Sequence, residues 1–248
     1  MVVGCGVGAV ARGRVRDDAK GDQYPGDSTV AETLRQVGVL DLQGGVQEHL
    51  EHLRLAGVSG KRVKEPADLE ALAGLIMPGG ESTCLARLLG IFGFEDPLRR
   101  AFARGMKIWG TCAGAILLAK TNVGDVSHLG LIDIDVKRNA FGSQLDSFKC
   151  EALVPAVHPE PLPLTFIRAP QILRVGRGVN VLLRLDDYIA AAESDEVLVT
   201  IFHPELTPGV AFHRYFAHKC GVLTEDDAAP ATVSDWNQKS WMRFAPIA

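Results

Sequence analysis

The sequence contains no apolar run that approaches the roughly 20 residues needed to cross a membrane. It also lacks a strong charge of either sign, because 26 basic and 30 acidic side chains leave a formal net charge of -4. Such a chain has no general electrostatic attraction for nucleic acid or for an anionic membrane surface. We therefore expect a cytoplasmic protein, associated with neither nucleic acid nor membrane, whose partners are small molecules or other proteins.

Paired cysteines are missing as well. The five cysteines, at positions 5, 84, 112, 150 and 220, form no C-x-x-C pair and do not cluster with histidine. An odd and scattered set of this kind disfavours both a disulfide framework and a zinc site, and it indicates reduced thiols in the cytosol. We expect no bound metal.

The first 36 residues differ in composition from the rest of the chain. The opening lacks the basic residues that precede the apolar part of a signal peptide, and three of its first ten residues are glycines. A G-x-G-x-x-A pattern at 4–9 mimics a dinucleotide fingerprint, but the strand and helix that such a loop requires are absent. We interpret 1–36 as a flexible N-terminal extension, 37–221 as the folded domain and 222–248 as a C-terminal tail.

Strand-like apolar runs alternate with helical segments in the first half of the domain. The predicted strands are 37–42, 61–64, 74–77 and a run that starts at 106; the predicted helices are 46–56, 67–72, 84–89, 96–104 and a run that follows 114. Such repeats predict a doubly wound parallel sheet, whose ligands bind beyond the carboxyl ends of the strands.

Shorter β-like runs follow residue 129, and we expect them to form antiparallel or mixed strands packed beside the parallel sheet. The fold class predicted is therefore α/β, with three layers and a mostly parallel sheet of flavodoxin-like type. A buried strand at 197–202 and a helix at 210–220 complete the domain. The shorter runs are 131–136, 147–153, 164–167, 172–175, 179–184 and 188–192.

A cysteine lies at the junction of the strand from 106 and the next helix, within G-T-C-A-G at 110–114. Glycines two residues before and after Cys112 permit a sharp strand-to-helix turn that exposes the side chain between them. The positive end of the following helix favours the thiolate. This pattern predicts a nucleophile elbow, although most cysteines near tight turns are simply buried.

A base for this thiol is available at the end of the strand 197–202. His203 follows this strand directly, and Glu205 stands two residues further on, where it can hold the imidazole in one tautomer. The same letters H-P-E occur at 158–160, but prolines on both sides of that copy favour a loop. We therefore prefer His203.

Several motifs together resemble one family, the glutaminase subunits of pyridoxal 5'-phosphate synthase, which belong to the class I (triad) glutamine amidotransferases. The resemblance covers about 37–216. The P-G-G-E-S-T, R-N-x-F-G and F-I-R-A-P motifs together are specific to that subunit, whereas the elbow and H-P-E motifs alone would indicate only the amidotransferase superfamily. The motifs are L-Q-G at 42–44, P-G-G-E-S-T at 78–83, G-T-C-A-G at 110–114, R-N-x-F-G at 138–142, F-I-R-A-P at 166–170 and F-H-P-E-L-T at 202–207.

The resemblance implies a role for each matching residue. Cys112 would attack the side-chain amide of glutamine, His203 would move protons, and Glu205 would orient His203. The backbone amides of Gly80 and Ala113 would form the oxyanion hole, with Gln43 in support. Glutamine would be held by Gly80, Glu81, Ser82, Arg138, Ile167 and Arg168.

The resemblance also implies a partner. The ammonia would pass through a channel to a separate (β/α)8-barrel synthase subunit, within a large hetero-oligomer, and pyridoxal 5'-phosphate would be the product of that complex rather than a cofactor of this chain. Two alternatives remain open from the sequence. The chain could serve another synthase, such as imidazole glycerol phosphate synthase, or it could be a non-catalytic subunit that binds glutamine or acts as a scaffold.

Overall fold

The computed structural model describes residues 36–138 and 147–223 of the chain. Most of the predicted extension and tail therefore lies outside the described residues. Within them, one sheet has the strand order β2-β1-β3-β4-β12-β11-β9-β6-β5, with β10 paired to β11. Its strands are β1 (Gln36–Leu40), β2 (Gly60–Val63), β3 (Leu72–Met77), β4 (Lys107–Thr111), β5 (Ala119–Asn122), β6 (Ile132–Lys137), β9 (Gln171–Val175), β10 (Asn180–Leu185), β11 (Tyr188–Glu193) and β12 (Val197–Thr200).

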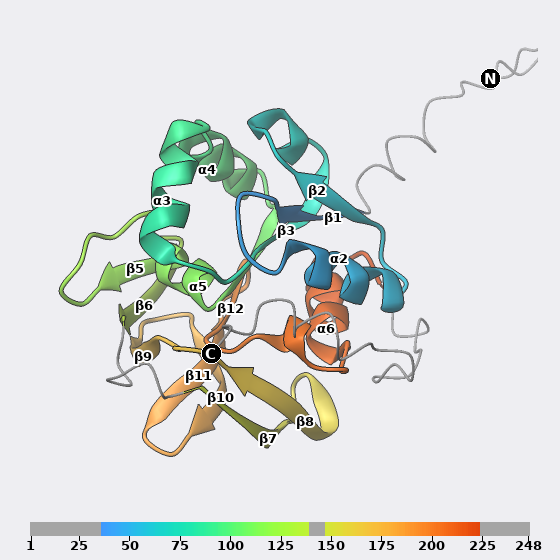
Figure 1. Cartoon of the computed structure of the whole chain (residues 1–248), viewed down its shortest axis with the longest axis vertical. Coiled ribbons are helices and arrows are strands. Elements are labelled where there is room, and N and C mark those ends of the chain that lie inside the picture. The colour runs from blue at the N-terminus through green and yellow to red at the C-terminus, as the bar shows by residue number, and fades with distance from the viewer. Residues whose placement is uncertain (1–35, 139–146, 224–248) are drawn as a thin grey trace, which may run out of the picture.

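Five neighbouring strands of this sheet, from β2 to β12, are all parallel. Figure 1 shows α2 and α6 on one face of these strands and α3, α4 and α5 on the other. This three-layer arrangement confirms the predicted α/β class. The helices are α2 (Val46–Leu55), α3 (Ser82–Ile91), α4 (Glu95–Ala103), α5 (Ala113–Leu118) and α6 (Ala211–Lys219), with short 3-10 turns η1 (Pro66–Leu69) and η2 (Pro204–Leu206).

Apolar side chains from the parallel strands form the centre of the core. Val39, Ile76 and Trp109 lie on three of these strands and are fully buried. They lie between helical layers that cover both faces, so strands of this kind carry continuous apolar sequence rather than alternating sequence. This burial explains why the sequence predicted these strands well.

The antiparallel strands do not pack beside the parallel sheet, as the sequence suggested, but continue it. β11 pairs antiparallel with β12, and β9 then pairs antiparallel with both β11 and β6. The reason is that β12 would otherwise leave an unpaired edge in the middle of the molecule, where its backbone groups need partners. Only β7 (Phe148–Val154) and β8 (His158–Phe166) form a separate two-stranded sheet in the described parts.

Three local predictions also change. The helix expected at 67–72 is the short 3-10 turn η1, after which β3 already begins at Leu72. The helix after the elbow ends at Leu118, and Ala119 and Lys120 belong to β5. The segment 158–160, expected to be a loop, is the start of β8.

Within residues 36–138 and 147–223, no helix is both long and apolar enough to cross a membrane.

Candidate active site

Four loops meet at one edge of the parallel sheet, because parallel strands carry their carboxyl ends to the same side. They follow β1, β3, β4 and β12 and bring Gln43, Gly80, Cys112 and His203 together. A cavity of about 210 Å³ lies at this edge. Its lining consists of Gly80, Glu81, Ser82, Cys112, Ile116, Arg138, Ile167, Arg168, Pro170 and His203.

Cys112 has the backbone of a strained turn, with φ 48° and ψ -102°. A Cβ added to Gly110 would lie 2.6 Å from the backbone carbon of Gly114, and one added to Gly114 would lie 2.2 Å from the carbonyl oxygen of Met77. Neither position has room for a side chain. The Cys112 amide donates to the Thr200 carbonyl at 2.8 Å, which fixes the turn against β12. The predicted elbow is thus present as a backbone geometry.

His203 lies beside Cys112, and its ring nitrogen on the other side contacts the Glu205 carboxylate. Its Nδ1 is 2.8 Å from Oε1 of Glu205, a carboxylate that is only 1% exposed. The His203 amide donates to the Thr165 carbonyl at 2.8 Å, which anchors the segment to β8. This arrangement leaves Nε2 of His203 as the nitrogen available to the thiol and the cavity.

Burial and neighbouring charges shift the pKa values of His203 and Glu205 in opposite directions. Burial alone would lower the pKa of His203, but Glu205 and Cys112 together raise it well above its ordinary value. Burial alone would raise the pKa of Glu205, but the facing imidazoles of His49 and His203 lower it to about 2. The carboxylate therefore remains ionised at neutral pH and favours an imidazolium at His203.

Gly79 allows the loop after β3 to pack closely against His203 and Cys112. A Cβ at this position would lie 2.4 Å from Cε1 of His203 and 3.2 Å from Cβ of Cys112. Only glycine allows the backbone to approach so closely. The next residue, Gly80, has φ 146°, a conformation that L side chains rarely adopt.

The loop after β1 contacts this same segment. Nε2 of Gln43 donates to the Glu81 carbonyl at 2.6 Å, and the Gln43 side chain covers Gly80. A Cβ on Gly44 would lie 2.0 Å from the carbonyl oxygen of Gly79. The two loops therefore pack closely against each other, and the support that Gln43 would give an oxyanion hole at Gly80 stays a prediction.

Glu81 and Arg138 form a charged wall of the cavity. The Glu81 carboxylate caps α3 by accepting from the amides of Thr83 at 3.0 Å and Cys84 at 2.6 Å. Arg138 donates to Glu81 at 3.2 Å and to the carboxylate of Asp125. The rest of the R-N-x-F-G motif lies outside the described residues.

The F-I-R-A-P segment closes another side of the cavity. Sγ of Cys112 lies 4.0 Å from the carbonyl oxygen of Ile167, a long contact for a thiol donor. Arg168 has φ 44°, a backbone strain of a kind that concentrates at binding sites. Both residues line the cavity, and their role in holding glutamine stays a prediction.

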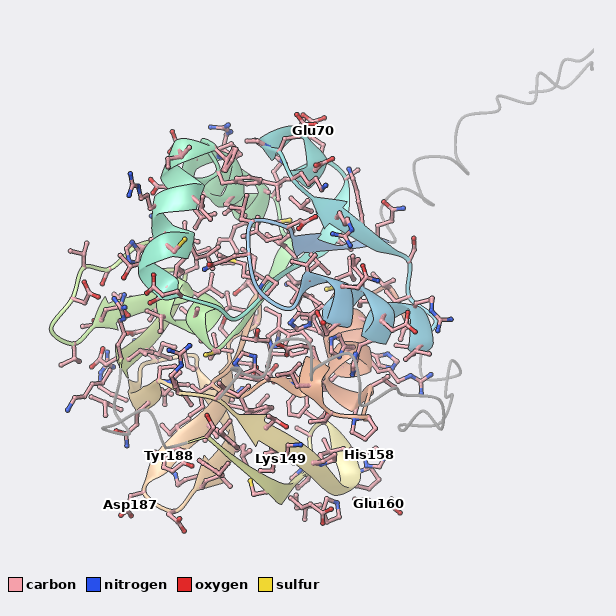
Figure 2. All side chains as sticks on the ribbon, viewed as in Figure 1. Glu70, Lys149, His158, Glu160, Asp187 and Tyr188 are labelled. Carbon is pink, nitrogen blue, oxygen red and sulfur yellow. The ribbon has the colours of Figure 1, made fainter. Side chains whose placement is uncertain are left out.

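The second H-P-E copy does not contribute to the cavity. Figure 2 shows His158 and Glu160 at the outer end of the β7–β8 hairpin, away from the centre of the molecule. The His158 ring contacts the backbone of Glu160, whose amide donates to Nδ1 at 3.2 Å. The geometry therefore supports the preference for His203, although the loop predicted at 158–160 was wrong, because this segment begins β8.

Sequence reasoning missed several residues of the site. Ile116, Pro170 and Asp125 contribute to the wall or to its charges, and the buried imidazoles of His49 and His213 lie behind Glu205. A signal existed for His49, which is three residues from the apolar position Val46 on the buried face of α2. No group of three or more His, Cys, Asp or Glu within the described ranges could hold a metal ion.

Comparison with known proteins agrees with this geometry. The model of the SNO glutamine amidotransferase family matches residues 39–222. Pyridoxal 5'-phosphate synthase subunit PdxT of Syntrophus aciditrophicus (strain SB) is 63% identical over 212 residues, which are 85% of this chain and 94% of that protein. The protein of the same name from Clostridium botulinum (strain Loch Maree / Type A3) is 50% identical over 186 residues, covering 74% of this chain and 96% of its own length.

A solved structure supports the same conclusion. A crystal structure described as a glutamine amidotransferase is 44% identical, has a TM-score of 0.71 and covers 75% of this chain and 99% of its own. The mostly parallel sheet with its helical layers is thus that of a class I glutamine amidotransferase-like fold. The family match spans most of the chain, and the chain belongs to the SNO glutamine amidotransferase family.

Proposed function

We propose that this chain is the glutaminase subunit of pyridoxal 5'-phosphate synthase, which hydrolyses L-glutamine to L-glutamate and ammonia in vitamin B6 biosynthesis. The observation that carries the proposal is the line of side chains from Cys112 through His203 to the buried Glu205, at a small cavity that Cys112 and His203 line. A relative that is 63% identical bears the name of that subunit, which favours this synthase over imidazole glycerol phosphate synthase.

The reaction begins at the sulfur. The Cys112 thiolate, formed as His203 takes the thiol proton, attacks the amide carbon of the glutamine side chain, and the carbonyl electron pair moves onto oxygen. When this tetrahedral adduct collapses, His203 returns a proton to the nitrogen and ammonia leaves. Glu205 keeps Nδ1 of His203 engaged throughout, so that Nε2 faces the reacting atoms.

The negative oxygen of the adduct requires donors that are already in place. We assign the backbone amides of Gly80 and Ala113 to this role, with Gln43 holding the Gly80 loop through its bond to Glu81. Ala113 is the first residue of α5, where the amides have no partner within the helix. In comparable sites one such donor contributes about 3 kcal/mol to the transition state.

The charged wall supplies the contacts for the amino acid end of the substrate. Gly80, Glu81, Ser82, Arg138 and the Ile167–Arg168 segment line the cavity around Cys112. An arginine holds a carboxylate in two parallel bonds, and a glutamate can accept from an ammonium group. Because Arg138 is already paired with Asp125 and Glu81, substrate must share or replace one of these partners.

The second half of the reaction releases glutamate. Water, deprotonated by His203, attacks the thioester carbon, and the Cys112 sulfur leaves and recovers its proton. We propose that the ammonia passes to a separate (β/α)8-barrel synthase subunit in a hetero-oligomer. Pyridoxal 5'-phosphate is then the product of the complex and not a cofactor of this chain.

The proposal is tested by glutamine hydrolysis in the presence of the barrel subunit. Cys112→Ala and His203→Ala should each remove hydrolysis while the two subunits still co-purify. His158→Ala is the matched control, because it changes the same H-P-E letters on the exposed hairpin, and it should hydrolyse glutamine like the unaltered chain. Unchanged hydrolysis in Cys112→Ala would reject Cys112 as the nucleophile. No hydrolysis in the unaltered complex would reject the glutaminase function in favour of a scaffold role.

A further inference from the structure

Two buried histidines extend the line of catalytic side chains beyond Glu205. His49, on α2, and His213, on α6, are both 0% exposed. Nε2 of His49 lies 3.5 Å from Oε2 of Glu205, and Nδ1 of His49 lies 2.9 Å from Nε2 of His213. The helices that carry them pack against each other, and α2 also packs against η2. The line therefore runs from the elbow through η2 into the helical layer.

Two buried polar atoms in this line, one on Glu205 and one on His49, can satisfy each other's need for a hydrogen-bond partner. Oε1 of Glu205 is engaged by His203, but Oε2 is buried and has no hydrogen-bond partner in the described part of the chain. The same is true of Nε2 of His49. At 3.5 Å the two atoms are slightly too far apart for a hydrogen bond, and catalytic hydrogen bonds commonly shorten when substrate is bound. A buried carboxylate oxygen without a hydrogen-bond donor lowers stability, which favours a shorter distance and a hydrogen bond between the two atoms.

Hydrogen-bond logic assigns one polarity to the line. A carboxylate can only accept, so Nε2 of His49 must carry a proton. Burial lowers the pKa of His49 to about 4 and that of His213 well below its ordinary value, so both rings are neutral at pH 7. Nδ1 of His49 then accepts, and Nε2 of His213 must donate to it. Nδ1 of His213 is left as a bare acceptor, in agreement with its lack of a partner among the described residues.

We propose that His49 is a positioning residue of the active site, which donates from Nε2 to the second oxygen of Glu205, and that His213 fixes the tautomer of His49. This inference rests on the proposed glutaminase function. His49 contacts neither the thiol nor the cavity, so it acts through Glu205 and His203. With both carboxylate oxygens engaged, Glu205 cannot rotate away from Nδ1 of His203.

Few titratable groups lie near Glu205 among the described residues. The neighbouring histidine His52 contacts backbone carbonyls rather than the carboxylate, since its Nε2 lies 2.8 Å from the Thr207 carbonyl oxygen and its Nδ1 lies 2.9 Å from that of Glu48. Its ring is tilted against that of His213, with centroids 4.7 Å apart. Gly45 approaches with backbone alone. Among the described residues, the titratable groups around Glu205 are His203 from its own segment, His49 and His52 from α2, His213 from α6, and Cys112 beyond His203.

The first test reads the tautomers directly in the full chain. Long-range ¹H–¹⁵N correlation spectra with labelled histidine, at pH 7.5, should show His49 and His213 as neutral rings protonated at Nε2. A spectrum in which His49 carries its proton at Nδ1 would overturn the proposal. This result does not depend on activity, so it separates failure of the inference from failure of the glutaminase function.

The second test compares two amides at position 49 in the complex with the barrel subunit. The Nε2 of glutamine is as many bonds from Cβ as that of histidine, so His49→Gln keeps a donor near Glu205, while the shorter His49→Asn does not. We expect His49→Asn to lower kcat at least tenfold with KM changed less than about twofold, and His49→Gln to retain most of kcat. Equal values for the two variants would contradict the proposal.

His52→Gln is the control, because it removes a buried imidazole of the same helix that does not face Glu205. It should leave kcat within about twofold even if it lowers the melting temperature. A loss of kcat in His52→Gln as large as that in His49→Asn would reduce His49 to a packing role. If the His49 variants do not fold, the tautomer spectrum of the unaltered chain decides the matter.

Discussion

At the scale of single residues, Cys112 combines a reactive side chain with an unfavourable backbone. Its φ of 48° and ψ of -102° lie outside the regions that residues with a Cβ normally occupy. Strain of this kind costs about 1–3 kcal/mol and persists because the surrounding structure imposes it. Here the packing of Gly110 and Gly114 and the bond to Thr200 impose it.

Removing the Cβ should therefore relieve the strain. Cys112→Gly is expected to melt at a higher temperature than Cys112→Ala, by about 2–4 °C for each kcal/mol of strain released. Glycine ordinarily loses about 0.5–1 kcal/mol to alanine through chain entropy, so the expected order is the reverse of the usual one. Thermal unfolding followed by circular dichroism measures it. A more stable alanine variant would show that the turn is not strained.

At the scale of elements, two glycines in helices differ in the space available for a side chain. Gly90, in α3, has open space around its Cβ position, where only Oε1 of Glu95 approaches, at 4.0 Å. Gly90→Ala should raise the free energy of unfolding by about 0.5–1 kcal/mol through helix propensity. Urea unfolding monitored by fluorescence would measure this gain.

Gly114→Ala is the contrasting variant of the same substitution. Its Cβ would lie 2.2 Å from the Met77 carbonyl oxygen, so β3 and α5 would have to separate. We expect a loss of about 1–3 kcal/mol or more, together with loss of activity. If Gly114→Ala were as stable as Gly90→Ala, the close approach at the elbow would be contradicted.

The sequence predicted elements best where burial is complete. β1, β3, β4 and β12 carry continuous apolar runs and were found within a few residues of their ends. β8 was misread because of its prolines at 159, 161 and 163. These prolines are spaced two apart, so the positions that lack an N–H lie on one side of the strand. Among the described residues β8 pairs with β7 alone, so its other edge needs no donors for a further strand.

The candidate site shows the same division. Residues in loops with distinctive chemistry, such as Cys112 and Arg168, were identified from motifs and lie on one cavity. His49 and His213 were not, because a histidine on the buried face of a helix has the same spacing as a core residue. Only the tertiary packing of α2 on α6 and η2 places their nitrogens in line with Glu205.

At the scale of the whole molecule, the buried imidazoles make stability depend on pH. His49 and His213 have a lowered pKa in the folded chain because of burial, but titrate near 6.5 when unfolded. The unfolded state therefore binds more protons as the pH falls below about 6.5, and stability decreases in that range. Glu205, with a folded pKa of about 2, adds to the loss below about 4.5.

His203 acts in the opposite direction, since its raised pKa stabilises the fold below about 6.5 and that contribution is lost as the pH rises. We expect the free energy of unfolding to be greatest near neutral pH and to fall between pH 6.5 and 4.5. Urea unfolding at several pH values measures this slope. His213→Leu should reduce it, whereas an unchanged slope in that variant would show that His213 is not a neutral buried ring.

The strain at Cys112 also has an evolutionary consequence. Because the backbone conformation of position 112 suits glycine better than any residue with a Cβ, the cysteine lowers the stability of the fold and is retained for its reactivity. In a duplicated copy that no longer needed to release ammonia, folding alone would favour substitution at this position, while Gly110 and Gly114 would remain fixed by packing. An inactive descendant of this chain would then be recognised by its intact glycines around a missing cysteine.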